Sequence, residues 1–383
     1  MKAKIKSEEF ARKVQLAALA AAGKIEGVGT EILTCLKIKT REKEIEITGV
    51  NLVWSMVKRF EADVAEPGMA AVMAKMLSEV VPFCKAEFTQ LETVRNKLRI
   101  QSGTFLIELN TMPAYSFPDF EPEDVEYFIQ MPGTQLRSMI KAVTSSAAGE
   151  DNRPMLSGTL LKTESDGGQG ALTLAAVDGF RLAEEQWPIE IPSGMKEICA
   201  VVPAKAFEKL AKHLEGEETV VIALTVKGKI QLRYDGTIIT INPISGVFPD
   251  YRPIIPTQAA TIASFSVDNL LEGLRSGRLI GLHGDFQIRP EVNGRGNVSL
   301  EVVSETGHVK NQIEAQVQGE PQDIRLNLQY LREAIEGCSI LGYNSVYLAT
   351  TGMEKPILVT PTQGEADKDR PMARFVIMPV LSN

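Results

Sequence analysis

The chain has little of the side chains that most often carry enzyme chemistry: its 383 residues include 3 His, 4 Cys and 2 Trp. The histidines are distant from one another and from the cysteines, and they stand at His213, His283 and His308. This spacing gives poor support to a zinc site or a His-based catalytic triad. The cysteines form no C-x-x-C pair, which favours reduced thiols used as core residues, at Cys35, Cys84, Cys199 and Cys338.

Short catalytic and cofactor motifs are missing as well. The sequence contains no Walker A sequence, no G-x-S-x-G and no G-x-G-x-x-G after a strand. Acidic pairs such as Glu8-Glu9 and Glu217-Glu218 fit exposed helix starts or turns better than acid–base catalysis, because carboxylates are favoured at helix N-termini. We therefore expect no metal, no cofactor and no catalytic constellation.

Long apolar runs are also absent. No stretch reaches the roughly 18 consecutive apolar residues that a membrane-spanning helix needs. Residues 1–10 alternate charged and apolar side chains and lack the apolar core of a signal peptide. We expect a cytoplasmic protein with no membrane partner.

The composition is that of a folded globular protein, with 44% hydrophobic and 23% charged residues. At about 150 residues per domain, the length predicts two or three domains. The chain has 41 basic and 49 acidic residues and a formal net charge of −8. An acidic chain repels nucleic acid as a whole, so a nucleic-acid surface here requires basic groups gathered on one face.

A short strand followed by an amphipathic helix recurs along the chain. In the first copy, Phe10, Val14 and Ala17 share one helical face at i, i+4 and i+7. Similar units begin near residues 126 and 264, and these are domain-sized steps. A second, interleaved series predicts helices over residues 73–81, 204–214 and 328–336. The simplest interpretation is six similar units in three pairs.

Between the predicted helices lie runs with a period of two, such as Glu44–Ile47 and Lys229–Tyr234. Alternation of this kind predicts antiparallel sheets with one wet face and with helices packed on the other. The expected class is α+β, with three similar domains of antiparallel sheets and paired helices. Proline-containing links follow Phe117–Phe120 and Phe248–Tyr251, so we place the domains at residues 1–122, 123–258 and 259–383.

Basic residues are enriched on the predicted helices. Over the six helical segments, Lys and Arg number 11 against 8 Asp and Glu, although the whole chain is acidic. Two segments carry basic stripes opposite their apolar face, formed by Arg137 and Lys141 and by Lys205, Lys209 and Lys212. One interpretation is a solvated face with no partner. The other is a surface that follows the phosphates of a duplex without reading its bases.

Four strings point to a known family. They are Arg153–Gly158 (RPMLSG), Val177–Ala183 (VDGFRLA), Phe248–Arg252 (FPDYR) and Val376–Leu381 (VIMPVL). These four strings, in this order along the chain, resemble sequences of the bacterial DNA polymerase III beta sliding clamp family. The match runs through all three thirds of the chain, in register with the predicted repeat.

The resemblance implies a head-to-tail homodimer that closes into a ring of six similar domains, with helices lining the hole and sheets outside. Such a ring holds duplex DNA topologically and without sequence preference. It tethers the replicative polymerase, and a separate clamp loader opens it, both through short linear motifs. The implied protein is a processivity factor and not an enzyme, and it has no nucleotide site of its own.

The resemblance also assigns site residues. The implied partner-peptide pocket consists of Leu156, Val177, Gly179, Phe180, Arg181, Leu182, Pro249, Ile254, Val376, Ile377, Met378, Pro379, Val380 and Leu381. Arg181 is expected to hold a polar group of the peptide. Phe180 departs from the family, which usually has His there, and Ser382-Asn383 extend past the usual tail. From the residues alone, Leu156, Val177 and Leu182 fit an ordinary core equally well.

Two further surfaces complete the prediction. The expected DNA-facing residues are Lys24, Arg137, Lys141, Arg153, Lys205, Lys209, Lys212, Arg275, Arg278 and Arg332. The resemblance makes Phe105–Leu109 the edge strand that pairs with the third domain of a second copy. Ile107 and Leu109 are then interface anchors, with Leu279 or Ile280 opposite them.

Two alternatives remain open. A clamp-fold protein that binds partners without encircling DNA fits the same strings. An α+β enzyme that acts on a small molecule in an interdomain cleft fits the composition, although the missing His, Cys and metal motifs count against it.

Overall fold

The computed structural model describes residues 1–23, 31–118, 123–149, 153–166, 169–192, 194–212, 214, 216, 218–291, 295–362 and 372–381. The chain divides into two compact units. Unit 1 consists of Met1–Pro132 and Glu217–Pro243, and unit 2 consists of Gly133–Gly216 and Ile244–Asn383. Within the described residues, no helix is both long enough and apolar enough to cross a membrane.

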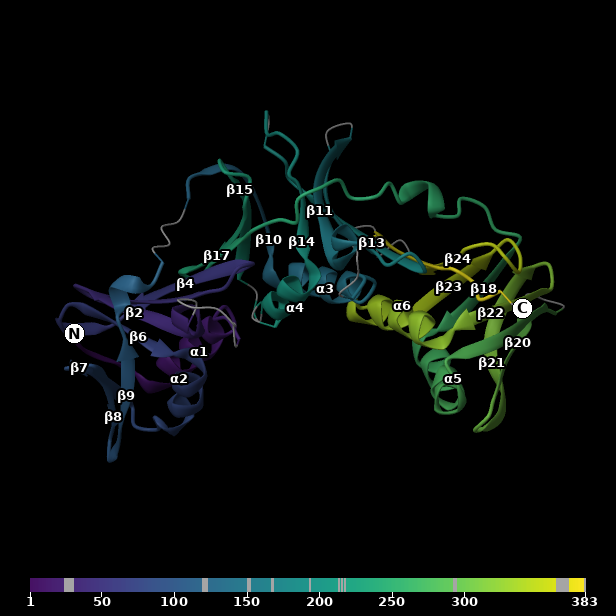
Figure 1. The fold of residues 1–383 in the computed structure, drawn as a ribbon. Coiled ribbons are helices and arrows are strands. Elements are labelled where there is room, and N and C mark those ends of the chain that lie inside the picture. Colours follow the sequence, from purple (N-terminus) through teal and green to yellow (C-terminus); the bar gives the residue numbers. More distant parts are fainter. Residues whose placement is uncertain are drawn as a thin grey trace. The chain divides into compact units, whose positions relative to one another are not determined.

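The predicted recurring unit is confirmed. Along the described chain, each helix follows a strand (Figure 1). Three strands come after each helix before the next strand–helix pair, except that the short β5 (Asp63–Glu66) makes four after the first helix. The helices are α1 (Ser7–Ala18), α2 (Ala74–Val80), α3 (Gly133–Thr144), α4 (Ala204–Ala211), α5 (Val267–Ile280) and α6 (Leu328–Ile340). Their apolar spacing explains them: on α3, for example, Leu136, Met139, Ile140 and Val143 are all buried at intervals of three and four residues.

Unit 1 contains one 13-stranded sheet. Its strands run in the order β10 (Val125–Pro132), β15 (Thr219–Thr225), β16 (Ile230–Tyr234), β17 (Thr237–Ile241), β4 (Trp54–Glu61), β3 (Glu44–Val50), β2 (Cys35–Arg41), β6 (Gly68–Met73), β9 (Phe105–Met112), β8 (Lys97–Ser102), β7 (Phe88–Val94), β1 (Lys2–Lys6) and β5 (Asp63–Glu66). Helices α1 and α2 pack against each other and against strands of this sheet.

Unit 2 contains a 12-stranded sheet. Its strands run in the order β14 (Cys199–Pro203), β11 (Gly158–Asp166), β12 (Gln169–Val177), β13 (Arg181–Ile189), β25 (Met372–Ile377), β24 (Ile357–Pro361), β23 (Ser345–Thr350), β18 (Thr261–Ser266), β21 (Gly307–Gly319), β20 (Arg295–Ser304), β19 (His283–Pro290) and β22 (Gln322–Asn327). The strand pairs of both sheets are antiparallel, so the predicted α+β class with antiparallel sheets is confirmed.

The two sheets join strands from different thirds of the sequence. In unit 1, β17 pairs with β4, and Thr237 lies opposite Lys58. In unit 2, β13 pairs with β25, and Arg181 lies opposite Ile377. The strands of the middle third are therefore shared between the two sheets. The domain boundaries near residues 122 and 258 stay a prediction.

A buried ionic cluster fastens the β4–β17 junction of unit 1. The Asp235 carboxylate accepts hydrogen bonds from the ammonium groups of Lys58, at 2.8 Å, and Lys13, at 3.0 Å. Both lysines are buried, and Lys58 also donates to the backbone carbonyl of Asp235. Asp235 and Gly236 form a two-residue hairpin turn with positive φ at both positions, as a type I′ turn requires.

The cluster shifts the pKa of its members in opposite senses. Burial lowers the pKa of the Lys58 ammonium to about 8, against the raising effect of Asp235. Burial by itself raises the pKa of the Asp235 carboxyl, but the hydrogen bonds from Lys58 and Lys13 outweigh it and lower that pKa to about 2. Two buried ammonium groups thus share one carboxylate, and removing it leaves both without their counter-ion.

We predict that Asp235→Asn lowers the free energy of unfolding by about 3 kcal/mol, the low end for a broken buried ion pair because the carboxylate is itself half exposed. Asn tolerates positive φ, so the turn is kept and only the charge is lost. Chemical denaturation of wild type, Asp235→Asn and the control Asp63→Asn, at an exposed position of β5, measures the difference.

The pH dependence of stability tests the same cluster with wild type and Asp235→Asn. Because the pKa of Asp235 is lowered in the folded state, the contribution of its carboxylate to the free energy of unfolding is fully present above about pH 4. That contribution is lost as the pH falls toward 2. The stability difference between wild type and Asp235→Asn should therefore shrink over that range. A difference that stays constant down to pH 2 contradicts the assignment.

Candidate functional sites

Four helices form one continuous layer in unit 2. Helix α3 packs against α4 on one side and against α6 on the other, and α6 packs against α5. The layer covers one face of the 12-stranded sheet, because α4 contacts β11 and β14, α3 contacts β12 and β13, α6 contacts β24 and β25, and α5 contacts β20 and β21. Figure 1 shows the row α4, α3, α6, α5 along this sheet.

The outward side of this layer carries most of the predicted DNA-facing residues. Fully exposed are Lys141, Lys205, Lys209, Lys212, Arg275 and Arg278, while Arg137 and Arg332 are half-buried. Acidic side chains lie on α4, α5 and α6, at Glu208, Asp268, Glu272, Glu333 and Glu336. Helix α3 has no acidic residue.

Positive charge in the layer is concentrated on α3 and α4. On α6 the Arg332 guanidinium pairs with Glu336 at 2.6 Å, and on α5 Arg275 lies 3.9 Å from Glu272. These neighbours offset the basic charge of the two helices. On α3 and the α4 segment, Lys141, Lys205, Lys209 and Lys212 are all exposed.

The other two predicted DNA-facing residues are Lys24, which is outside the described residues, and Arg153, which is not on a helix of the layer. Arg153 is exposed and lies beside the turn between β12 and β13, where its guanidinium donates to the Asp178 carbonyl at 3.3 Å. Its DNA contact stays a prediction.

Several of the predicted pocket residues meet on the sheet of unit 2. Four of them, Leu156, Val177, Leu182 and Val376, belong to one buried cluster, which also contains Leu160, Ala175 and Tyr251. We call this set the tail cluster. Leu182 lies directly opposite Val376 in the β13–β25 pair. Ile377 is the next residue along β25, so it points to the opposite face of the sheet.

Exposed apolar residues surround the tail cluster. Phe180 is 61% exposed and Ile254 is 43% exposed, and Gly179, Pro249 and Met378 are also exposed. Phe248 and Ile255 pack against the cluster from the segment that leads into the third part of the sequence. Buried aliphatic residues are thus flanked by exposed apolar ones.

The turn between β12 and β13 holds Phe180 in place. The Asp178 carboxylate accepts from the backbone N–H groups of Phe180, at 2.8 Å, and Arg181, at 3.0 Å. Gly179 has φ of +97°, which disfavours any side chain there. The Met378 N–H donates to the Phe180 carbonyl at 2.8 Å, so the C-terminal tail is attached to the same turn.

The tail then leaves the cluster. The Val380 N–H donates to the Arg325 carbonyl at 2.8 Å, which places this residue beside β22, the last strand of the sheet. A hollow of about 240 Å³ lies there, and its walls include Ile324, Met353 and Leu381. Pro379 connects Met378, which is bonded to Phe180, with Val380 beside β22. Ser382 and Asn383 lie outside the described residues.

Arg181 makes its contacts within the chain. Its Nε donates to Asp178 at 2.9 Å, its terminal nitrogens donate to Glu333 and to the Ser145 carbonyl, and its guanidinium lies 4.3 Å from the centre of the Tyr330 ring. Tyr330 and Glu333 are on α6, and Ser145 follows α3. Arg181 therefore links the Phe180 turn to two helices of the layer, and its contact with a peptide stays a prediction.

A polar network that sequence reasoning missed lies behind the tail cluster. The Tyr251 hydroxyl donates to Glu184 at 2.8 Å, and Arg374 donates to the second oxygen of that buried carboxylate at 2.9 Å. Burial, with a further contribution from Glu184, raises the pKa of the Tyr251 hydroxyl. The only sign of this network in the sequence is the string Phe248–Arg252, which contains Tyr251. Nothing in that string shows that Glu184 is the partner of the Tyr251 hydroxyl.

Besides the terminal strands of the two sheets, two of the final strands of the repeated units keep an open edge. The final strands of the six repeated units are β4, β9, β13, β17, β21 and β25. Four of them pair across units of the sequence, as β4 with β17 and β13 with β25. On the side away from β8, β9 pairs with β6 only through Thr111 and Met112. On the side away from β20, β21 pairs with β18 only through residues 316–319. Within the described chain, residues 105–110 and 307–315 therefore have one unpaired side.

Exposed apolar residues lie near both open edges. Beside β9, the rings of Phe83 and Phe105 stack with centroids 5.9 Å apart, and Phe83 is 61% exposed. Beside β21, Leu279 is 81% exposed, and Gly307 lies next to Ile280. Ile107 is half-buried and Leu109 is buried on β9. The structure thus places the four predicted interface residues next to open edges.

Among the described residues, no three His, Cys, Asp or Glu side chains come together as a group that would hold a metal ion.

Sequence profiles of one family match this chain. The DNA polymerase III beta subunit, N-terminal domain, matches residues 1–121, and its central domain matches residues 130–250, which together exceed half of the chain. The beta sliding clamp of Bacillus subtilis (strain 168) is 22% identical over 347 residues, covering 87% of this chain and 89% of that protein. The beta sliding clamp of Streptomyces coelicolor is 24% identical over 359 residues, covering 91% and 92%.

Solved structures show the same fold. A DNA polymerase sliding clamp from Bacillus subtilis superposes with a TM-score of 0.88 at 22% identity, over the full length of both chains. The DNA polymerase III subunit beta from Pseudomonas aeruginosa gives a TM-score of 0.85 at 23% identity, over 99% of this chain and 100% of the other.

We predict that Arg181→Met destabilises the protein by about 2 kcal/mol, because it leaves Asp178 and Glu333 without a cation they both bind. Arg181→Lys should recover only part of this, since an ammonium cannot reproduce the planar fork of donors. Chemical denaturation provides the measurement, and Arg153→Met, at an exposed guanidinium beside the same turn, is the control. Equal effects at the two positions contradict the prediction.

Proposed function

This chain belongs to the DNA polymerase III beta subunit family, and on that premise we propose that it is a sliding clamp that encircles duplex DNA and tethers the replicative polymerase. The observation that carries the proposal is the helical layer of unit 2, with its exposed lysines on α3 and α4. A chain of net charge −8 that nevertheless gathers basic groups on one surface has the electrostatics needed to follow phosphates. The proposed role is non-catalytic.

We propose that the helical layer binds the phosphates of DNA without distinguishing one base sequence from another. Lysine ammonium groups on long, flexible stems suit phosphates, because they act as point charges and do not need a fixed direction. The contribution of α5 and α6 is smaller, since Glu272 and Glu336 offset Arg275 and Arg332. The central pair of helices, α3 and α4, is therefore the principal DNA contact.

We propose that two copies close the ring through their open strand edges. The final strands β9 and β21 of each chain are open over most of their length, so two copies arranged head to tail pair each of these two edges with the other. Ile107 and Leu109 are the anchors on one side, and Leu279 and Ile280 lie on the other. With domains at 1–122, 123–258 and 259–383, the ring has six.

The tail cluster and its exposed surroundings are the proposed site for short linear motifs of the polymerase and the clamp loader. Binding sites of this kind combine a buried aliphatic floor with exposed apolar anchors. Leu156, Val177, Leu182 and Val376 supply the floor, and Phe180, Ile254 and Met378 supply the rim. Arg181 acts here as a positioning residue, because its contacts hold the turn that carries Phe180.

Threading is tested with nicked circular and linearised DNA after loading by the cognate clamp loader. We expect the protein to be retained on the circle and to escape from the linear form, because a ring leaves only over a free end. Equal escape from both forms contradicts encirclement and favours a clamp-fold protein that binds partners alone.

The charge assignment has its own prediction. Changing Lys141, Lys205 and Lys209 together to Gln should weaken binding to a short linear duplex. The slope of the logarithm of the binding constant against the logarithm of the salt concentration should become shallower by about 0.9 for each lost phosphate contact. The control changes Lys43, Lys227 and Lys355, three exposed lysines in connections between strands. Fluorescence anisotropy across a salt series compares the two triple variants, and equal losses contradict the assignment.

For the tail, deletion of residues 378–383 should weaken binding of a polymerase-derived motif peptide at least about tenfold, because hot-spot residues contribute 2 kcal/mol or more. Retention on nicked circular DNA should be unchanged. Val226→Ala, at an exposed apolar residue of unit 1, outside the unit that contains the tail, is the control. Undiminished peptide binding after the deletion contradicts the placement of the site.

A further inference from the structure

Both open edges carry a pair of opposite charges on the outer face of the sheet. On the first edge, Arg99 of β8 lies directly opposite Glu108 of β9, and their side chains bond at 2.9 Å. On the second edge, Glu301 of β20 lies directly opposite Lys310 of β21, at 3.6 Å. Glu108 and Lys310 are thus each backed by the opposite charge on the strand behind, and Glu314 lies four residues beyond Lys310 on the same side of β21.

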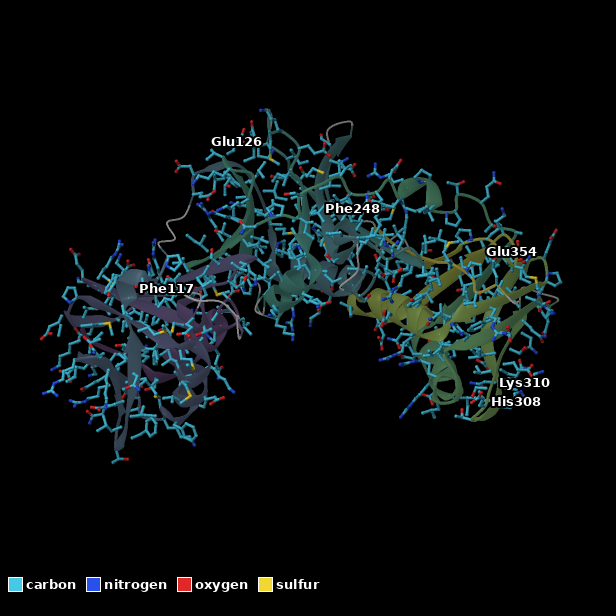
Figure 2. The ribbon with its side chains drawn as sticks, in the orientation of Figure 1. Phe117, Glu126, Phe248, His308, Lys310 and Glu354 are labelled. Carbon is cyan, nitrogen blue, oxygen red and sulfur yellow. The ribbon has the colours of Figure 1, made fainter. Side chains whose placement is uncertain are left out.

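All four side chains face away from the helices. On the second edge, Leu300, Val302 and Ile313 are the residues that lie against the glycines of α5, so their neighbours Glu301 and Lys310 point to the other face. On the first edge, Leu98 and Leu109 are buried, and Glu108 is exposed. Figure 2 shows Lys310 beside His308, and both side chains reach Glu301.

The two edges have complementary terminal charges. Glu108 ends the first edge and Lys310 ends the second. If β9 of one copy pairs with β21 of another so that these residues are opposite, four neighbouring strands carry the alternating series Arg99, Glu108, Lys310, Glu301. Opposite charges placed directly across a strand pair stabilise it, and like charges destabilise it.

We propose that this charge ladder sets the register in which two copies of the chain join, with Glu108 of one copy opposite Lys310 of the other. The inference rests on the proposed function, because it assumes that β9 and β21 pair between copies. Shifting one strand by one residue against the other turns its inward side chains outward. Only registers that differ by an even number of residues are therefore alternatives to this one. The ladder distinguishes among these, since a shift of two residues places Glu108 opposite the uncharged Gln312 or opposite His308.

The length of the open edges agrees with this register. The six open residues of β9, Phe105 to Asn110, then face residues 313 to 308, all inside the open part of β21. On the helix side, Phe105 faces Ile313 and Leu109 faces Val309, so apolar residues meet in these two pairs, while Ile107 between them faces Asn311. The shift that places Glu108 opposite His308 moves Asn110 past the end of β21, which begins at Gly307.

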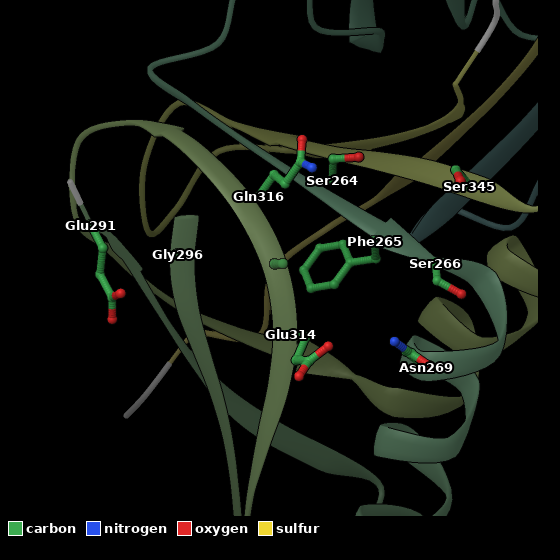
Figure 3. Close-up of a pocket in the computed structure, with 10 residues that line it drawn as sticks. Ser264, Phe265, Ser266, Asn269, Glu291, Gly296, Glu314, Gln316 and Ser345 are labelled. Carbon is green, nitrogen blue, oxygen red and sulfur yellow. The ribbon is translucent and has the colours of Figure 1, made fainter. Parts of the chain in front are cut away.

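The register also assigns a role to the hollow where β18 and β21 separate. This hollow of about 640 Å³ is lined by polar groups, including Ser266, Asn269, Glu314 and Gln316 (Figure 3). Figure 3 shows Glu314 and Asn269 on facing walls. Continuing the same register past Phe105 puts Thr104, in the turn between β8 and β9, opposite Glu314. The partner's turn then covers the mouth of the hollow.

Disulfide trapping tests the register directly. In a Cys199→Ser background, which removes the exposed cysteine, we compare three double variants: Glu108→Cys with Lys310→Cys, with Gln312→Cys and with His308→Cys. Residues directly opposite in an antiparallel pair have Cα atoms about 4.5–5.5 Å apart, within the range a disulfide needs, whereas diagonal residues do not. We expect a covalent dimer, seen on non-reducing gels, to form fastest with the 108–310 pair.

A charge exchange tests the energetic part. Glu108→Lys and Lys310→Glu should each weaken self-association at least about fivefold, measured by sedimentation over a dilution series, since each places like charges opposite one another. The protein with both changes should recover most of the wild-type association, because the pair is restored with its signs exchanged. Glu126→Lys, at an exposed position of β10, is the matched control.

The outcomes separate the register from the proposed ring. Fastest trapping by the 312 or 308 pair, or failure of the double charge exchange to restore association in a protein that is otherwise dimeric, overturns the ladder and leaves the ring intact. A wild-type chain that sediments as a monomer at all concentrations overturns the ladder together with the ring.

Discussion

Everything in this structure depends on the pairing of strand edges. A strand with one unpaired side presents a row of N–H and C=O groups that have no partner in the sheet. The chain meets this constraint by joining the final strands of its repeated units, β4 with β17 and β13 with β25. The same repetition leaves β9 and β21 partly open, so the repeat that builds the two sheets also produces the surfaces for assembly.

Side chains reinforce the pairing in different ways at each junction. At β4–β17 the support is ionic, with Lys13 and Lys58 buried around Asp235. At β13–β25 it is apolar on one face, where Leu182 meets Val376, and ionic on the other, where Arg181 reaches α6. These clusters join residues more than 150 positions apart, so each one ties distant parts of the chain together.

The apolar site and the helical layer are connected through one residue. Arg181 holds the turn that presents Phe180 and also contacts Tyr330 and Glu333 of α6. The floor of the proposed site is part of the core of unit 2, so the core interpretation of Leu156, Val177 and Leu182 is confirmed, and their role in a binding site stays a prediction. In the proposed site, the exposed rim supplies the anchors and the core supports them.

The sequence alone determined the repeated strand and helix unit, the antiparallel class and the basic character of α3 and α4, because these depend on periodicity within short segments. Only the tertiary structure decided which charged side chains are exposed and which are paired or buried. Arg332 is offset by Glu336, Lys13 is buried, and Arg181 is engaged with α6. Nor does any local pattern show that β9 and β21 are the strands left open. Pairing between distant strands depends on the whole fold, and neighbouring sequence carries no record of it.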